Sequence, residues 1–170
     1  MSEGDDLRRQ AEELCFDREW DLYLKSNATG WDLKSMTLLM SIKTVADFWR
    51  TFNNLPNILV GTCNLFLMAK GVKPLWEENG GLFDGGGCWS VVVRSGSSWL
   101  EVSQNLAMCL VGESAFGETV MGACFVPVGN HHVICKIWCT AKRQSDGDTL
   151  TSALREFSPC AARFKLFATG

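Results

Sequence analysis

The order of strand-like and helical segments along the chain constrains the fold most strongly. Three segments with apolar residues at helical spacing, 45–55, 98–110 and 149–157, are predicted as helices. Short segments rich in Val, Ile, Phe and Trp are predicted as strands, namely 20–25, 33–42, 64–70, 89–94, 119–128, 132–140 and 163–169. Because strands and helices do not alternate strictly, the pattern favours an α+β fold with a mainly antiparallel sheet. The helices would cover one face of the sheet and leave the other face free for a ligand.

Local signals predict where the three helices begin and end. Thr44 with Asp47, and Ser98 with Glu101, have the spacing of a capping box at a helix N-terminus. Pro159 is expected to end the third helix, because proline cannot continue the hydrogen-bond pattern.

Length and charge narrow the class of protein. A chain of 170 residues suits one domain, expected over 16–170 behind a flexible polar arm at 1–15. The net charge of −3 argues against general electrostatic binding of nucleic acid, which needs an excess of Lys and Arg. The N-terminus lacks the apolar core of a signal peptide, and no apolar run reaches the roughly 18 residues of a membrane span. We therefore expect a cytoplasmic protein without membrane contact, with some nuclear protein as an alternative.

The eight cysteines do not indicate a metal site or an enzyme. None stands in a Cys-x-x-Cys pair and the two histidines are adjacent, so no metal or cofactor is predicted. His132 lies near Cys135 and Cys139, which raises the alternative of a Cys–His nucleophile. Strand alternation would place His132 on the opposite face from both thiols, so we predict no catalytic residues.

Tryptophans in loops suggest a site for a flat ligand. Trp76 and Glu77 follow each other on a loop stiffened by Pro74, and Trp31 lies in another loop. Two such rings can clamp a planar group while the neighbouring carboxylate binds its edge. The alternative is that both tryptophans rim an ordinary hydrophobic face and that Glu77 is a solvated acid. Composition alone favours this alternative.

Several further motifs follow one another along the chain between Trp20 and the C-terminus. They are Thr44-Val45-Ala46-Asp47-Phe48-Trp49, Gly71-Val72-Lys73-Pro74-Leu75-Trp76-Glu77, Gly86-Gly87-Cys88-Trp89, Trp99-Leu100-Glu101, Cys109-Leu110-Val111-Gly112-Glu113, Gly122-Ala123 and Ile137-Trp138. The ordered set resembles the mRNA cap-binding proteins of the eukaryotic translation initiation factor 4E family. The resemblance implies a curved sheet with three helices on its convex face and a ligand slot on its concave side.

The resemblance also implies a binding site for 7-methylguanosine. Trp31 and Trp76 would stack on the two faces of the base, Glu77 would bind its edge, and Trp138 would contact the N7-methyl group, pack in the core, or both. Methylation at N7 makes guanine cationic, which strengthens its attraction to indole faces. A carboxylate can then accept two charge-assisted hydrogen bonds from the edge of the base.

The phosphate contacts differ from those of the family, which points to a divergent paralogue. The family's basic residues would fall near Val128 and Ile134, and an arginine often precedes the position of Trp89, where this chain has Cys88. Lys136 is the first candidate for the phosphates, because alternation puts it on the same face as Trp138. The other candidates are His132, Lys142 and Arg143.

A second site is implied on the helical side. Partners of the family place a helix bearing Tyr-x-x-x-x-Leu and an apolar residue against a surface tryptophan, here Trp49. Val45, Leu100, Glu101 and Gly112 would complete this surface, whereas Trp20, Trp89 and Trp99 are expected in the core. The expected partners are capped mRNA and a scaffold factor like initiation factor 4G, or 4E-binding proteins. The alternative is an adaptor or translational repressor of the same fold with impaired cap binding.

Overall fold

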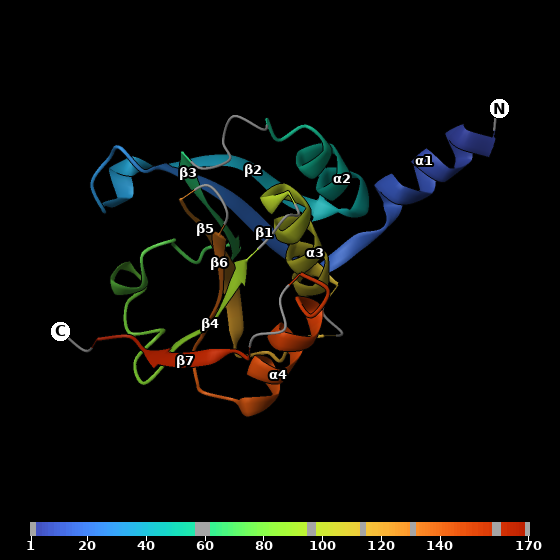
Figure 1. Ribbon diagram of the computed structural model, residues 1–170. Helices are drawn as coiled ribbons and strands as arrows, with labels where there is room; N and C mark the ends of the chain where they lie inside the picture. Colours follow the sequence, from blue (N-terminus) through green and yellow to red (C-terminus); the bar gives the residue numbers. More distant parts are fainter. Residues whose placement is uncertain are drawn as a thin grey trace.

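A sheet of seven antiparallel strands forms the centre of the computed structural model (Figure 1). The structure describes residues 3–56, 62–94, 98–112, 115–129, 132–157 and 161–168. The strand order is β2-β1-β3-β5-β6-β4-β7. Their bounds are β1 Cys15–Ser26, β2 Met36–Thr44, β3 Cys63–Ala69, β4 Gly87–Arg94, β5 Val120–Val128, β6 His132–Cys139 and β7 Arg163–Leu166. The predicted mainly antiparallel sheet is confirmed.

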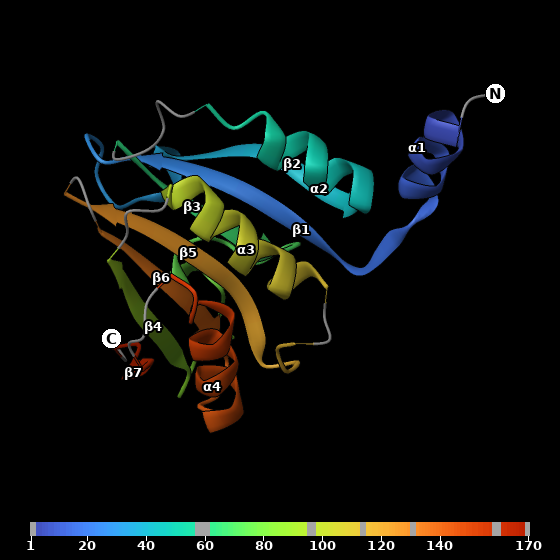
Figure 2. The same ribbon diagram turned by 45° about the vertical axis from the view of Figure 1, so that its right-hand side comes forward.

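Three helices cover one face of this sheet, as predicted. They are α2 (Val45–Asn53), α3 (Trp99–Val111) and α4 (Gln144–Ala153), and both views place them on the same side (Figures 1 and 2). A fourth helix of the described residues, α1 (Glu3–Glu13), extends away from the sheet at the N-terminus. It lies in the segment expected as an arm, and Glu12 forms an ion pair with Arg50 of α2. None of the described helices is both long and apolar enough to cross a membrane.

Some helix ends are set by local sequence signals and others by tertiary contacts. Thr44 and Asp47 form the predicted capping box at the start of α2. Ser98 precedes α3 but its side chain makes no capping hydrogen bond, so the second capping box was wrong.

The helix α4 begins five residues before the predicted start at Thr149 and ends at Ala153, four before Phe157. The buried Asp146 anchors its first turn by accepting hydrogen bonds from Gly117 N (3.2 Å) and Thr119 Oγ1 (3.0 Å). These partners lie far away in the sequence, so the local pattern could not reveal the helix start. The proline expected to end this helix lies outside the described residues.

The core fills the space between the helices and the sheet. Trp20, Trp89 and Trp99 are buried there, as expected. Odd-numbered residues of β4 and β6, such as Trp89, face the helices, and the Trp89 ring lies against Gly147 of α4. The alternate residues of the same strands, including Cys88 and Trp138, therefore face the opposite side.

Two short 3₁₀ helices stand at this opposite face. They are η1 (Leu33–Ser35) and η3 (Trp76–Glu78), which appear as blue and green turns on the side of the sheet away from α2, α3 and α4 (Figure 1). The segment 33–35 had been predicted as the start of a strand. Asp32 caps it as a helical turn instead, because its carboxylate accepts from Ser35 N at 2.8 Å. The open face of the sheet thus carries both loops that contain the candidate tryptophans.

Candidate functional site

Two adjoining cavities lie on the open face of the sheet and share three tryptophans. Trp31, Trp76 and Trp138 line both of them. The larger cavity, about 430 Å³, is also lined by Glu77 and its neighbours on the same loop. The smaller, about 310 Å³, is also lined by Phe66, Cys88, Cys124, Lys136, Lys165 and Phe167, among others. The structure therefore brings the four residues predicted to bind a base, Trp31, Trp76, Glu77 and Trp138, to one place.

Trp31 stands at the mouth of these cavities. Its side chain is 63% exposed, and its ring meets Phe66 of β3 edge to face, with centroids 6.3 Å apart. The ammonium of Lys25 lies 4.4 Å from the Trp31 ring centroid, within the range of a cation–π contact. Trp31 thus presents a largely free indole to solvent while its position is set by contacts with β1 and β3.

Lys25 is a buried residue that the sequence analysis did not single out. Its side chain is 1% exposed, and Nζ donates to Ser26 O at 2.9 Å and to Thr29 O at 3.0 Å. Both acceptors belong to the loop that leads to Trp31. Lys25 therefore holds the backbone of this loop as well as its tryptophan, and a lysine at the end of a strand gives no local signal of that role.

The loop that carries Trp76 is held by Asn79. Its side-chain amide donates to Leu75 O (2.7 Å) and Lys73 O (3.0 Å) and accepts from Lys73 N (2.8 Å). Trp76 is half-buried, and the next residue, Glu77, is exposed at the larger cavity. Asn79 thus fixes the chain on both sides of the tryptophan and limits where the carboxylate can lie.

Phe167 stacks on Trp76 and was not predicted. The two rings are nearly parallel, at 7°, with centroids 5.4 Å apart. Phe167 follows β7, and its N–H donates to Gly86 O at 3.1 Å, which holds the backbone beside β4. One face of Trp76 is therefore covered within the chain. A planar ligand has the other face available.

Trp138 lies at the floor of both cavities. It is 7% exposed and meets Phe66, Phe83 and Phe167 edge to face at centroid distances of 6.1, 5.7 and 5.4 Å. The residue therefore packs in an aromatic cluster and also lines the cavities. Both roles considered for it are geometrically compatible.

The four candidate phosphate ligands lie in different places. Lys136 lines the smaller cavity, whereas His132 is exposed at the far end of β6 and lines neither cavity. Lys142 lies over the rings of Trp89 (5.8 Å) and Phe164 (5.4 Å), on the helical side of the sheet. The guanidinium of Arg143 lies beside Gly117, at the loop before β5. Of these four, the structure brings Lys136 to the cavities.

The thiols near the site are poorly suited to nucleophilic chemistry. Burial raises the pKa of Cys124 and of Cys139 to about 12, and it raises the pKa of Cys135 as well. Cys135 is buried on the helical side, whereas His132 points to the open face, as strand alternation predicted. Among the described residues there is also no group of three or more His, Cys, Asp or Glu that could hold a metal ion.

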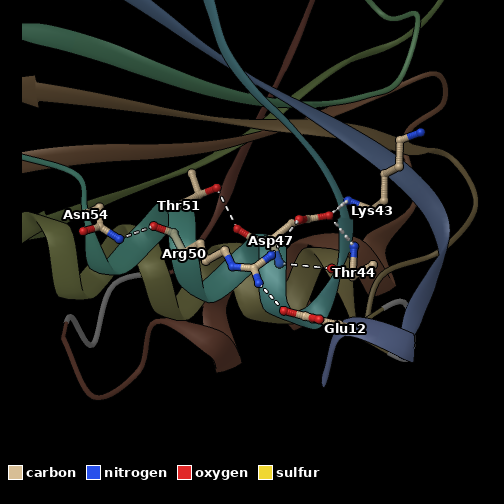
Figure 3. Close-up of polar contacts among 7 residues, drawn as sticks. All are labelled: Glu12, Lys43, Thr44, Asp47, Arg50, Thr51 and Asn54. Carbon is tan, nitrogen blue, oxygen red and sulfur yellow. Dashed lines mark hydrogen bonds and ion pairs between the residues drawn. The ribbon is translucent and has the colours of Figure 1, made fainter. Parts of the chain in front are cut away.

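The second surface was predicted around Trp49 on the helical side. Trp49 of α2 is 39% exposed, packs edge to face on Phe48 at 5.3 Å, and lines a groove of about 300 Å³ beside α1. Polar contacts along α2 fix this helix, including the ion pair between Arg50 and Glu12 (Figure 3).

The other residues predicted for this surface are spread along α2 and α3, which lie side by side (Figures 1 and 2). Val45 opens α2, while Leu100 and Glu101 lie in the first turn of α3 and Gly112 caps its end. Met108 is 39% exposed and lies one turn before Gly112. It was not predicted for this surface, because an apolar residue in a helix is usually assigned to the core. The structure therefore does not gather Leu100 and Gly112 at one point.

Comparison with known proteins identifies similar sequences. Residues 15–163 match the family model described as eukaryotic initiation factor 4E. Eukaryotic translation initiation factor 4E of Xenopus laevis is 29% identical over 143 residues, which are 76% of this chain and 63% of the relative. Eukaryotic translation initiation factor 4E-1B of Danio rerio is 27% identical over 113 residues, or 61% and 51%. The chain spans about half the length of the zebrafish relative.

Solved structures share the fold. The complex of Caenorhabditis elegans eIF4E-3 with the 4E-binding protein Mextli aligns with a TM-score of 0.75 and 21% identity over 90% of this chain and 93% of that one. Ascaris suum eIF4E-3 with m7G cap gives a TM-score of 0.75 and 21% identity over 92% and 93%. At 21% identity, the similarity to these structures shows a shared fold and nothing further.

Proposed function

The chain belongs to the eukaryotic initiation factor 4E family, and on this premise we propose that its two cavities bind the 7-methylguanosine cap of mRNA. The observation that carries the proposal is the convergence of Trp31, Trp76, Trp138 and Glu77 on one cavity. A cationic base would stack between Trp31 and the face of Trp76 that Phe167 leaves open. The protein would act as a binding protein in the cytoplasm, and not as an enzyme.

Physical chemistry supports this assignment of roles. Stacking on an aromatic side chain is worth about 1–3 kcal/mol per base, and the positive charge of the methylated ring adds cation–π attraction. Glu77 would accept hydrogen bonds from N1–H and the exocyclic amino group, which an unmethylated guanine donates less strongly. Trp138 at the cavity floor would contact the N7-methyl group.

The helical side supports a second part of the proposal, partner binding. The exposed Trp49 of α2 and the exposed Met108 of α3 stand on helices of the same side of the sheet, where a helix bearing Tyr-x-x-x-x-Leu and an apolar residue would dock. Among the structural neighbours, C. elegans eIF4E-3 is in complex with the 4E-binding protein Mextli. Partners of this class, or a scaffold like initiation factor 4G, would dock on this side.

A calorimetric titration with 7-methyl-GTP and with GTP tests cap binding. We expect the methylated nucleotide to bind at least tenfold more tightly, because only its base is cationic and cation–π attraction to an indole face is worth about 1–2 kcal/mol. Glu77→Gln and Trp76→Ala should each remove this preference. Glu156→Gln, which changes an exposed carboxylate after α4, is the matched control and should retain it.

Equal affinities for the two nucleotides, or no binding of either, would contradict the proposal. That result would favour the alternative of an adaptor that keeps the fold without useful cap binding. This alternative is considered because three of the four candidate phosphate ligands, His132, Lys142 and Arg143, do not line the cavities.

A further inference from the structure

The loop that carries Trp76 gives its indole ring little support of its own. The 3₁₀ helix η3 contains no buried residue, and Leu75, which precedes it, makes no capping hydrogen bond with its side chain. Asn79 holds the backbone of this loop, but its hydrogen bonds join main-chain atoms and not the indole. The orientation of the Trp76 ring therefore depends on contacts from outside the loop.

Phe167 supplies the aromatic contact of Trp76. In the part of the chain that the structure describes, Phe167 is the one ring that packs on the Trp76 ring, nearly parallel at 7° and with centroids 5.4 Å apart. Phe167 also meets Phe83 and Trp138 edge to face, each at a centroid distance of 5.4 Å. Both of these rings are buried. Phe167 thus joins the Trp76 ring to the aromatic cluster at the floor of the cavities.

The strand β7 determines where Phe167 lies. Phe167 follows this strand directly, and its N–H donates to Gly86 O, just before β4. The strand β7 lies at an edge of the sheet, where it pairs with β4 alone, and its residues are exposed or half-buried. An edge strand with few buried side chains belongs to the part of a fold that opens at low cost in free energy. The support of Trp76 therefore depends on the pairing of β7 with β4.

Phe167 stands behind the face of Trp76 that a base would use. Trp31, Trp76 and Glu77 line the larger cavity, and Phe167 is not among the residues that line it. Phe167 lines the smaller cavity instead. A base stacked between Trp31 and Trp76 would therefore have Phe167 on the far side of the Trp76 indole.

We propose that Phe167 is a positioning residue for the base site, which holds the Trp76 ring in its stacking orientation before a ligand arrives. The proposal rests on the proposed function, because it concerns the same aromatic site. When a binding-competent orientation is populated for only part of the time, the apparent affinity falls by that fraction. Because coupling between two sites is reciprocal, a bound base should in turn stabilise the pairing of β7 with β4.

The first test replaces the Phe167 ring. Phe167→Leu keeps an apolar side chain and removes the stacked ring. We expect the affinities for 7-methylguanosine and for 7-methyl-GTP to fall by the same factor, about fivefold, which lies within the range for one aromatic pair. In stopped-flow measurements of tryptophan fluorescence, the association rate constant should account for most of this loss, because fewer free molecules have the competent orientation. Phe167→Tyr keeps the ring and should bind like the wild type.

Phe164→Leu is the matched control. Phe164 belongs to the same strand, but its ring packs on Trp89 at a centroid distance of 5.1 Å, on the helical side of the sheet. This variant should bind both ligands like the wild type. Equal losses of affinity in Phe164→Leu and Phe167→Leu would overturn the positioning role. Tighter binding by Phe167→Leu would also overturn it, because Phe167 would then occupy the place of the ligand.

Hydrogen exchange separates this proposal from the proposed function. In the chain without ligand, the amides of residues 75–79 should exchange faster in Phe167→Leu than in the wild type, and at the wild-type rate in Phe164→Leu. Unchanged exchange in Phe167→Leu would overturn the positioning role whether or not nucleotides bind. A wild-type chain that binds neither ligand would contradict the proposed function, whereas faster exchange in Phe167→Leu would still support the role of Phe167.

The coupling to β7 has its own readout. Addition of 7-methyl-GTP to the wild type should slow the exchange of amides in residues 163–167, and Phe167→Leu should lose most of this protection at a saturating ligand concentration. A wild-type chain that binds 7-methyl-GTP without any slowing in β7 would overturn the coupling between the strand and the base site.

Discussion

Individual residues of the site differ in how far the sequence could reveal them. Trp31, Trp76 and Glu77 were predicted because tryptophan and an adjacent carboxylate are unusual in loops, and because their order matches a known family. Lys25 and Phe167 were missed because their contacts depend on how distant strands pair. Lys25 reaches its loop from the end of β1, and Phe167 reaches Trp76 from beyond β7. Such contacts have no counterpart in local sequence patterns.

Replacement of Lys25 tests how Trp31 is positioned. In Lys25→Met the loop carbonyls of Ser26 and Thr29 lose their donor and Trp31 loses its cation–π contact. We expect faster hydrogen exchange of the amides in residues 26–32, and roughly fivefold weaker binding of 7-methyl-GTP, since a partly buried cation–π contact is worth about 1 kcal/mol.

Lys34→Met provides the matched control, because Lys34 is exposed in the neighbouring 3₁₀ helix η1. Its exchange rates and affinity should match those of the wild type. Unchanged exchange in Lys25→Met would show that the loop is held in place without this lysine.

At the scale of elements, the local capping signal was right for α2 and wrong for α3. The helix α2 begins where the spacing of Thr44 and Asp47 predicted, because a capping box involves four consecutive residues. The helix α4 was misplaced because its first turn is anchored by a buried aspartate bonded to the loop before β5. Hydrophobic periodicity gives the presence of a helix more reliably than its ends, which depend on such partners.

The cap of α2 predicts a pH dependence of stability. Partial burial acts to raise the pKa of Asp47, but hydrogen bonds from Lys43 N and Thr44 N, with the charge of Arg50, outweigh it and leave the pKa below the ordinary value of 3.8. A carboxyl group with a lowered folded-state pKa stabilises the fold above its unfolded pKa, and this contribution disappears as pH falls through the folded value. The effect of removing Asp47 should therefore depend on pH.

We expect Asp47→Ala to lower the free energy of unfolding by about 1 kcal/mol above about pH 5, the usual cost of losing a helix cap. The difference from the wild type should shrink as the pH falls below 3.8, because the wild-type carboxyl then becomes protonated. Urea unfolding at a series of pH values measures this difference in the free energy of unfolding. Asp148→Ala, which changes an exposed residue of α4, should show a much smaller effect. A constant difference at all pH values would contradict the role of the charge.

At the scale of the whole molecule, the sheet separates two surfaces. The cavities lie on its open face. Trp49 belongs to α2, one of the helices that cover the other face (Figure 2). The sequence predicted that helices would cover one face, because their apolar stripes need a common surface. It could not predict the strand order, in which β7 pairs with β4 and brings Lys165 beside Cys88. Strand order depends on contacts across the whole chain, and local patterns do not encode it.

A substitution on one face of the sheet should weaken binding at that face and leave binding at the opposite face unchanged. In Trp49→Ala, we expect binding of a peptide with a Tyr-x-x-x-x-Leu-hydrophobic motif to weaken about 30-fold, as for an interface hot spot worth about 2 kcal/mol. Retention on a 7-methyl-GTP resin should persist, because Trp49 lines neither cavity on the open face. Trp31→Ala is the reciprocal control, which should no longer be retained on the resin but should still bind the peptide. Peptide binding that survives in Trp49→Ala would refute the docking surface, and parallel loss of both ligands in either variant would show that the two faces are coupled through the sheet.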